Sequence, residues 1–461
     1  MKHLRVVAIL SALAAAAAPL MAQRQTPPEG SAPRDFQLAE PREITLPNGL
    51  KVVLVEYGQV PKATVSLVVR SGNANETKSQ VWLADLTGEL MQEGTATRTA
   101  EQVANEAASM GGQVFVGVGL DQTTIQGDAL SEFVPKMIAL VADVTRNPRF
   151  PESELSRLKA DLVRNVSIQR SQPQTMALEE FRRIMYPDHA YGRLYPADGQ
   201  VEGYTLADVR SFYRANFGAQ RARIYVVGKF DIAAAERAIQ EALGSWERGT
   251  PAAAPAPKPV SQRQLALIDR PNAPQSTIVM GLPTIDPTNA DYTRLLVTNT
   301  LLGGYFSSRI TSNIREDKGY TYSPFSTISS RYHDAYWAQN ADVTTAVTGA
   351  SLKEIFFEID RLRKEPPTQA ELQAVQNYLA GNFILGSSTR GGIVGQLSLL
   401  DFQGLPRTYL TEYVKRVMAT TPAEIQKTAE TYMDPSKMLI VITGDKKVIE
   451  EQVAPYRTVT P

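Results

Sequence analysis

The sequence has no cysteine and only three histidines, His3, His189 and His333, among its 461 residues. The absence of cysteine excludes disulfides, thiolate zinc sites, iron–sulfur clusters and cysteine nucleophiles, because each of these needs a sulfur atom. Lys+Arg and Asp+Glu both number 48, so the formal net charge is zero. A protein that binds nucleic acid normally presents a basic surface that displaces counterions from phosphates. We therefore expect no nucleic-acid partner.

The N-terminal residues have the layout of a secretory signal. Lys2 and Arg5 precede an apolar run over 6–21, and small residues precede a plausible cleavage site after Ala22. This run is shorter than the ~20 residues that span a hydrocarbon core. We predict a signal peptide over 1–22 and an exported, periplasmic protein with no stable membrane anchor after cleavage; a retained anchor is the alternative. The polar, proline-containing residues 23–40 predict a flexible lead-in.

Two parts of the sequence repeat one another at nearly constant spacing. Thr205 is followed three residues later by Asp208, and Thr421 by Glu424, and both pairs have the form of a capping box that opens a helix. The apolar run 224–228 ends in glycine, as does the run 440–444 at the same offset of 216 residues. Glu154-Leu155 and Glu371-Leu372 match as well, one residue further apart. Three matches in order at nearly one offset predict an internal duplication.

A Pro/Ala-rich stretch over 248–261 lies between the two copies, and its prolines favour an extended spacer. We predict an N-terminal domain over 41–247 and a C-terminal domain over 262–461. Hydrophobic periodicity predicts strands and helices in alternation, hence an α+β fold of mostly antiparallel sheets, each covered on one face by helices. The segments that carry this prediction are strands over 64–70 and 113–118 and helices over 81–91, 152–171 and 367–385.

Five short segments together resemble the pitrilysin-like peptidases, the family of insulin-degrading enzyme and the mitochondrial processing peptidase. These segments are Leu46-Pro47-Asn48-Gly49-Leu50, Glu93-Gly94-Thr95, and the residues over 186–193, 302–309 and 314–323. The resemblance covers nearly the whole chain after the signal peptide. It implies two homologous domains arranged as a clamshell.

Active members of this family carry H-x-x-E-H on the first helix, where two imidazoles bind Zn²⁺ and the glutamate activates a water molecule. The matching positions here are Asp85, Gly88 and Glu89, and His189 and His333 lie 144 positions apart. The chain therefore lacks the ligands, and we predict no metal or other cofactor in it. Asp85 and Glu89, four residues apart, are more plausibly solvated helix carboxylates than ligands of a hard cation such as Ca²⁺.

A second departure from the family lies in the strand over 113–118. Members with a working site usually carry Asn-Ala there, on the edge strand that pairs with the substrate. This sequence has Phe115, Val116 and Val118 instead, whereas Asp121 and Thr123 match the family. The polar groups that bind substrate beside the metal are therefore lost together with the metal ligands.

The C-terminal half keeps the family's other site residues. The resemblance places Arg315 and, seven residues later, Tyr322 against substrate and its developing oxyanion, a role that suits two fixed donors. A surface arginine and a core tyrosine would be the purely structural interpretation. Gly303, Gly304 and Ser307 precede them in the most specific segment and are candidate substrate-binding residues.

These observations favour one function and leave two others open. The favoured function is the non-metal subunit of a periplasmic heterodimeric zinc endopeptidase, inactive alone, whose homologous partner carries H-x-x-E-H and the zinc. Arg315 and Tyr322 would then act on peptide substrates in the partner's site. The alternatives are a catalytically inactive peptide-binding or scaffold homo-oligomer of the same fold, and a stabilising subunit of the kind found in respiratory complexes.

Overall fold

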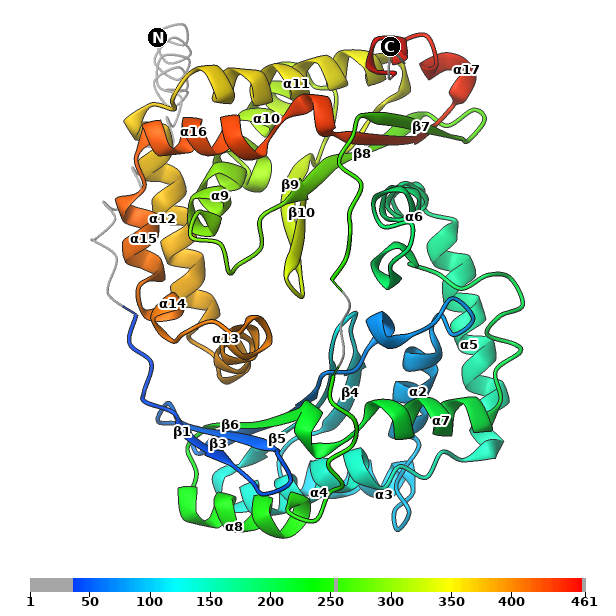
Figure 1. Ribbon diagram of the computed structural model, residues 1–461, viewed down its shortest axis with the longest axis vertical. Coiled ribbons are helices and arrows are strands. Elements are labelled where there is room, and N and C mark those ends of the chain that lie inside the picture. The colour runs from blue at the N-terminus through cyan, green and yellow to red at the C-terminus, as the bar shows by residue number, and fades with distance from the viewer. Residues whose placement is uncertain (1–35, 253–255, 458–461) are drawn as a thin grey trace, which may run out of the picture. The chain divides into compact units, whose positions relative to one another are not determined.

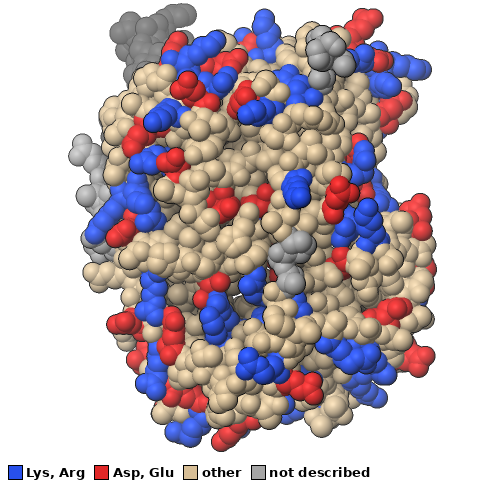
Figure 2. Space-filling model, in the orientation of Figure 1, with Lys and Arg blue, Asp and Glu red and all other residues tan. Residues whose placement is uncertain are grey.

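The computed structural model describes residues 36–252 and 256–457. The predicted signal peptide and most of the predicted lead-in lie outside the described residues. The parts of the predicted linker that are described, 248–252 and 256–261, form neither helix nor strand. Within the described ranges, no helix is both long and apolar enough to cross a membrane. Figure 2 shows acidic and basic side chains interspersed over the visible face, with no large region of one sign.

The N-terminal half is built on a six-stranded sheet (Figure 1). Its strand order is β1-β2-β6-β3-β5-β4. Its pairs are antiparallel except for the parallel pair of β2 and β6. β-branched and aliphatic residues dominate the central strands, which suits a pleated surface buried on both faces. The strands are β1 (Arg42–Thr45), β2 (Lys51–Glu56), β3 (Lys62–Val69), β4 (Val114–Val118), β5 (Thr123–Leu130) and β6 (Ala222–Gly228).

Helices of the same half pack on one face of this sheet and enclose its main hydrophobic core. α4 contacts β3 and β5, and α2 contacts β4. The helices of this half are α2 (Leu83–Gln92), α3 (Ala100–Ser109), α4 (Val134–Arg146), α5 (Glu152–Arg170), α6 (Pro173–Met185), α7 (Leu206–Asn216) and α8 (Ile232–Leu243).

The C-terminal half contains a five-stranded sheet with the order β7-β11-β8-β10-β9. The pair of β7 and β11 is parallel and the other pairs are antiparallel. This is the order of the first sheet without β1, with the parallel pair at the same place, so the topology repeats as the sequence predicts. The strands are β7 (Gln264–Asp269), β8 (Gln275–Thr284), β9 (Phe325–Arg331), β10 (Asp334–Thr344) and β11 (Leu439–Gly444).

The helices of the C-terminal half include two π-helical segments, η5 (Thr300–Gly304) and η6 (Ser312–Asp317), on either side of the short helix α10 (Arg309–Thr311). Its own helices α9, α11 and α16 enclose a second core with β8 and β10. The remaining bounds are α9 (Tyr292–Asn299), α11 (Thr348–Lys364), α12 (Gln369–Gly386), α13 (Arg390–Gln403), α14 (Thr408–Thr411), α15 (Tyr413–Ala419), α16 (Pro422–Tyr432) and α17 (Lys446–Ile449). The predicted α+β class with two homologous domains is confirmed.

The two halves exchange one helix each, which the sequence did not predict. α13 packs on the second face of the first sheet, where its residues Ile393, Val394 and Leu397 meet Val53 and Val227. α6 packs in the same way on the second sheet, and its Phe181 ring lies 5.5 Å from that of Tyr336. The prediction of helices on one face only is therefore wrong, because each sheet is covered on its other face by a helix from the opposite half.

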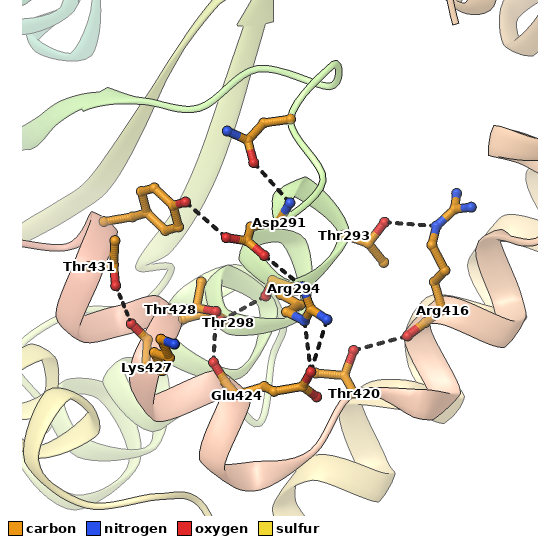
Figure 3. Close-up of polar contacts among 12 residues, drawn as sticks. Asp291, Thr293, Arg294, Thr298, Arg416, Thr420, Glu424, Lys427, Thr428 and Thr431 are labelled. Carbon is orange, nitrogen blue, oxygen red and sulfur yellow. Dashed lines mark hydrogen bonds and ion pairs between the residues drawn. The ribbon is translucent and has the colours of Figure 1, made fainter. Parts of the chain in front are cut away.

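Both predicted capping boxes are confirmed. Thr205 and Thr421 accept hydrogen bonds from the backbone N–H groups of Asp208 and Glu424, whose side chains bond back to the threonines. Glu424 also pairs with Arg294 of α9 at 2.9 Å, and Arg294 pairs with Asp291 at 2.6 Å (Figure 3). The second cap therefore also ties α16 to α9.

Candidate functional site

The three positions of the degenerate zinc motif lie on α2. Asn73 donates a hydrogen bond to Asp85 at 2.6 Å. Burial raises the pKa of Asp85, and the nearby Glu89 raises it further. Asp85 is therefore not the solvated carboxylate that the sequence predicts, because the segment before the helix folds over it. Glu89 is exposed.

Gly88, at the place of the family's glutamate, faces the side chains of β4. A Cβ added at Gly88 would lie 2.4 Å from Cγ2 of Val118 and 3.7 Å from Cγ1 of Val116. Two valines thus occupy the space that a longer side chain on α2 would need. Among the described residues, no group of three or more His, Cys, Asp or Glu side chains is arranged to hold a metal ion. The residues at this place do not fit zinc, which needs imidazole, thiolate or carboxylate ligands around an open volume.

A buried carboxylate that sequence reasoning missed holds the start of α2. The two oxygens of Glu76 accept hydrogen bonds from the backbone N–H groups of Trp82 (3.1 Å) and Ala84 (2.8 Å). Burial raises the pKa of Glu76 to about 8, although these donors oppose the shift. The bonds fix Trp82 at φ 68°, a left-handed conformation that costs a bulky residue energy. No local pattern marks Glu76, because its partners lie six and eight residues away.

The described histidines lie in turns. Nδ1 of His189 accepts a hydrogen bond from the backbone N–H of Tyr191 at 3.2 Å, and the two rings are 4.3 Å apart. His333 lies between β9 and β10 at φ 50°, with its ring 4.2 Å from that of Tyr332. Both rings therefore pack against a neighbouring tyrosine. His3 lies outside the described residues.

The structure brings Arg315 and Tyr322 together. Arg315 lies in η6, with its Cζ 4.9 Å from the centre of the Tyr322 ring and 4.3 Å from that of Phe306. Its Nε pairs with Glu316 at 3.1 Å. Tyr322 is 78% exposed and Phe306 63% exposed. We call Phe306, Arg315 and Tyr322 the Arg315 cluster. Tyr322 is not the core tyrosine of the structural interpretation.

Phe306 is the member of this cluster that the sequence did not single out. It lies in the segment 302–309, nine residues before Arg315, and this separation does not by itself predict a contact between the two side chains. It follows the end of η5 by two residues, whereas Arg315 lies in η6, so their contact depends on how the residues between the two elements fold. The only sequence signal is a phenylalanine flanked by polar residues just after two glycines.

The candidate substrate-binding residues have different surroundings. Gly303 is buried, and a Cβ there would lie 2.7 Å from Oε1 of Gln339 and from Oγ of Ser326, so its small size serves packing. Gly304 is partly exposed and Ser307 is exposed. Substrate contact by Gly304 and Ser307 stays a prediction.

Comparison with known families accounts for most of the described chain. The family model described as Insulinase (Peptidase family M16) matches residues 51–195. The model described as Peptidase M16 inactive domain matches residues 203–379. The chain belongs to peptidase family M16, the pitrilysin-like peptidases, and lacks the catalytic motif of that family.

Individual relatives can be aligned with this chain over most of their length. An uncharacterized zinc protease of Streptomyces coelicolor is 22% identical over 414 residues, which are 87% of this chain and 89% of the relative. An uncharacterized zinc protease of Mycobacterium tuberculosis is 26% identical over 375 residues, 78% of this chain and 84% of the relative.

Two solved structures share the fold. The peptidase M16 inactive domain from Pseudomonas fluorescens has a TM-score of 0.80 at 24% identity, covering 88% of this chain and 98% of that one. A protease from Helicobacter pylori has a TM-score of 0.81 at 19% identity, covering 88% and 100%. At these identities the likeness concerns the fold alone.

Proposed function

We propose that this chain is the non-metal subunit of an exported, periplasmic heterodimeric zinc endopeptidase. A homologous subunit with H-x-x-E-H would hold the zinc, and this chain would contribute the Arg315 cluster to the joint site. The observation that carries the proposal is the contrast between the two halves. On α2, Val118 fills the space beside Gly88, whereas Arg315 and Tyr322 meet at the surface of the other half.

The chemistry of the Arg315 cluster suits a bound peptide. A guanidinium stacked on aromatic rings keeps its N–H groups in its own plane, where they can donate to a carbonyl oxygen. Two rings and the Glu316 pair restrain Arg315, so little side-chain freedom remains to be lost when a peptide binds. Donors held in place before charge develops are the most effective stabilisers of an oxyanion. The Tyr322 hydroxyl would supply the second donor.

The test is to produce the chain alone and together with an M16 homologue that carries H-x-x-E-H. Alone, it should hold no stoichiometric zinc by elemental analysis and cleave no peptide, because it lacks ligands and base. Together, the two chains should give a 1:1 complex by native mass spectrometry, with an interface above ~1,000 Å² in total. Cell fractionation should find both in the periplasm.

Two outcomes would contradict the proposal. One tightly bound zinc ion per isolated chain would contradict the absence of a zinc site on α2. Homo-oligomers alone, formed in the presence of the homologue, would favour the inactive peptide-binding scaffold instead.

A further inference from the structure

A small pocket away from both α2 and the Arg315 cluster has an excess of positive charge. It measures about 210 Å³ and lies where one end of the first sheet meets α13. Four basic side chains line it and only one acidic side chain does. These residues are Lys51, Arg70, Arg221 and Arg223 from the N-terminal half, and Asp401, next to Phe402, from α13.

The single carboxylate of this pocket already has two partners. Asp401 accepts a hydrogen bond from the Tyr225 hydroxyl at 2.5 Å through one oxygen and pairs with Arg223 at 2.5 Å through the other. Both oxygens are therefore engaged, and Asp401 balances one of the four positive charges. No second carboxylate lines the pocket, so Lys51, Arg70 and Arg221 have no carboxylate partner there. Arg221 donates instead to the carbonyl oxygens of Arg70 and Ala215 and to Oδ1 of Asn216, all at 3.1 Å.

Arg70 is the most exceptional of these cations. Its guanidinium lies 4.4 Å above the Tyr332 ring and 5.7 Å from the Phe402 ring. In the described parts of the chain it makes no ion pair. Stacking uses the face of a guanidinium, so its N–H edge stays able to donate to an acceptor. Lys51, at the start of β2, is exposed and likewise has no ion pair within the described residues.

The pocket cations also repel one another. Burial lowers the pKa of Arg221, and the nearby Arg70 lowers it further. Burial lowers the pKa of Arg223 too, and Arg70 adds to the shift. Two carboxylates outside the lining partly offset this charge. Glu43, which pairs with Arg407 at 2.6 Å, raises the pKa of Arg223, and Arg70 opposes the rise in the pKa of Asp121, which accepts the Tyr191 hydroxyl at 2.8 Å. A bound anion would relieve this repulsion.

We propose that this pocket binds a small oxyanion, a carboxylate or phosphate group, with Arg70, Arg223 and Lys51 as its donors. The volume suits one such group, and charge-assisted hydrogen bonds from guanidinium nitrogen to an oxyanion are the strong kind. Because the lining comes from both halves of the chain, the anion also stabilises their contact. The inference does not depend on the proposed peptidase function.

Titration calorimetry on the full mature chain tests the site with three probes. These are inorganic phosphate, an N-acetylated tripeptide of alanine with a free C-terminal carboxylate, and the same peptide with a C-terminal amide. Phosphate or the free-carboxylate peptide should bind saturably and raise the melting temperature by mass action, whereas the amide should not. Binding of phosphate alone identifies a phosphate source, and binding of the carboxylate alone identifies a peptide source. No saturable binding of either overturns the proposal.

Variants locate the binding. Arg70→Gln and Lys51→Gln should each weaken the affinity about tenfold or more, the loss that one charge-assisted hydrogen bond produces. The control Arg237→Gln removes an equal charge from an exposed position on α8 and should leave the affinity unchanged. If Arg70→Gln destabilises the fold by removing the stacking on Tyr332, the test rests on Lys51→Gln, because Lys51 is exposed. An unchanged affinity of Lys51→Gln would then contradict the site. Equal weakening by all three variants would mean non-specific attraction and would contradict the site.

Discussion

At the scale of the residue, Gly88 shows how tightly α2 packs against β4. Gly88→Ala adds a Cβ that meets Val118 at 2.4 Å. Overpacking costs ~1–3 kcal/mol and outweighs the ~1 kcal/mol that alanine gains over glycine in a helix. We expect a net loss of unfolding free energy, measured by denaturant unfolding.

The Val118→Ala background provides the matched control. With the valine methyl groups gone, Gly88→Ala should become neutral or stabilising, because only the gain in helix propensity remains. A stabilising effect of Gly88→Ala in the wild-type background would show that the contact with Val118 is not tight.

Glu371 makes the stability of the protein depend on pH, and its hydrogen-bond partners set the sign of this dependence. Although partial burial opposes ionisation, hydrogen bonds from Arg309 (2.9 and 3.2 Å) and Thr368 lower the pKa of Glu371 from 4.5 to about 2. A lowered pKa in the folded state means that the carboxylate stabilises the protein above pH 4.5 and loses that contribution as the pH falls towards 2. We expect the stability difference between wild type and Glu371→Gln to shrink over this window, as denaturant unfolding at each pH would show. A difference that stays constant would contradict the assigned pKa.

Arg315 and Tyr322 provide the residue-scale test of the proposed mechanism. In the complex with the zinc-bearing homologue, Arg315→Ala and Tyr322→Phe should each lower kcat by ~10²–10³, the usual cost of one oxyanion donor. The double variant should cost less than the product of the two, because groups that act as a unit are not additive. Tyr322→Phe keeps the ring against Arg315 and removes only an exposed hydroxyl.

Assembly of these variants is the control. Both should still form the 1:1 complex in native mass spectrometry, since neither residue is part of a core. Peptide cleavage within about twofold of wild type by both variants, far below the loss of one donor, would make the contribution of this chain structural.

At the scale of the element, the two capping boxes can be compared directly. Thr205→Ala and Thr421→Ala should each lower the unfolding free energy by ~1 kcal/mol, because each leaves an N-terminal backbone N–H of its helix without an acceptor. Thr→Ser at either position keeps the hydroxyl and should change stability by only a few tenths of that amount. Thermal or denaturant unfolding would check both. Equal losses for the serine and alanine variants would exclude the hydroxyl as the cause.

The elements themselves were predictable where local signals are strong. The predicted helix over 152–171 is α5 (Glu152–Arg170), and the one predicted over 367–385 is α12 (Gln369–Gly386). The predicted helix over 81–91 begins at Leu83 instead, because Glu76 holds Trp82 in a left-handed conformation.

At the scale of the molecule, the exchanged helices predict that neither half is stable alone. Separated from α13, the first sheet would expose a face that includes Val53, Val55 and Val227. A contiguous apolar face of this kind promotes aggregation. We expect residues 36–252 and 256–457 to be largely insoluble when expressed separately and to form a soluble 1:1 complex when co-expressed, as size-exclusion chromatography would show. A soluble, monomeric N-terminal half would contradict this.

The sequence by itself determined the duplication, the α+β class, the family and the loss of the zinc motif. These follow from periodicity, from short motifs and from the absence of histidine pairs, all of which are local properties of the chain. The resemblance of the segment 314–323 to the family also singled out Arg315 and Tyr322 as candidate site residues. Only the tertiary structure decided what surrounds these residues: Val118 against Gly88, Phe306 against Arg315, α6 and α13 on the opposite sheets, and four cations around one pocket. Each of these contacts joins side chains through packing between elements, which no local pattern in the chain encodes.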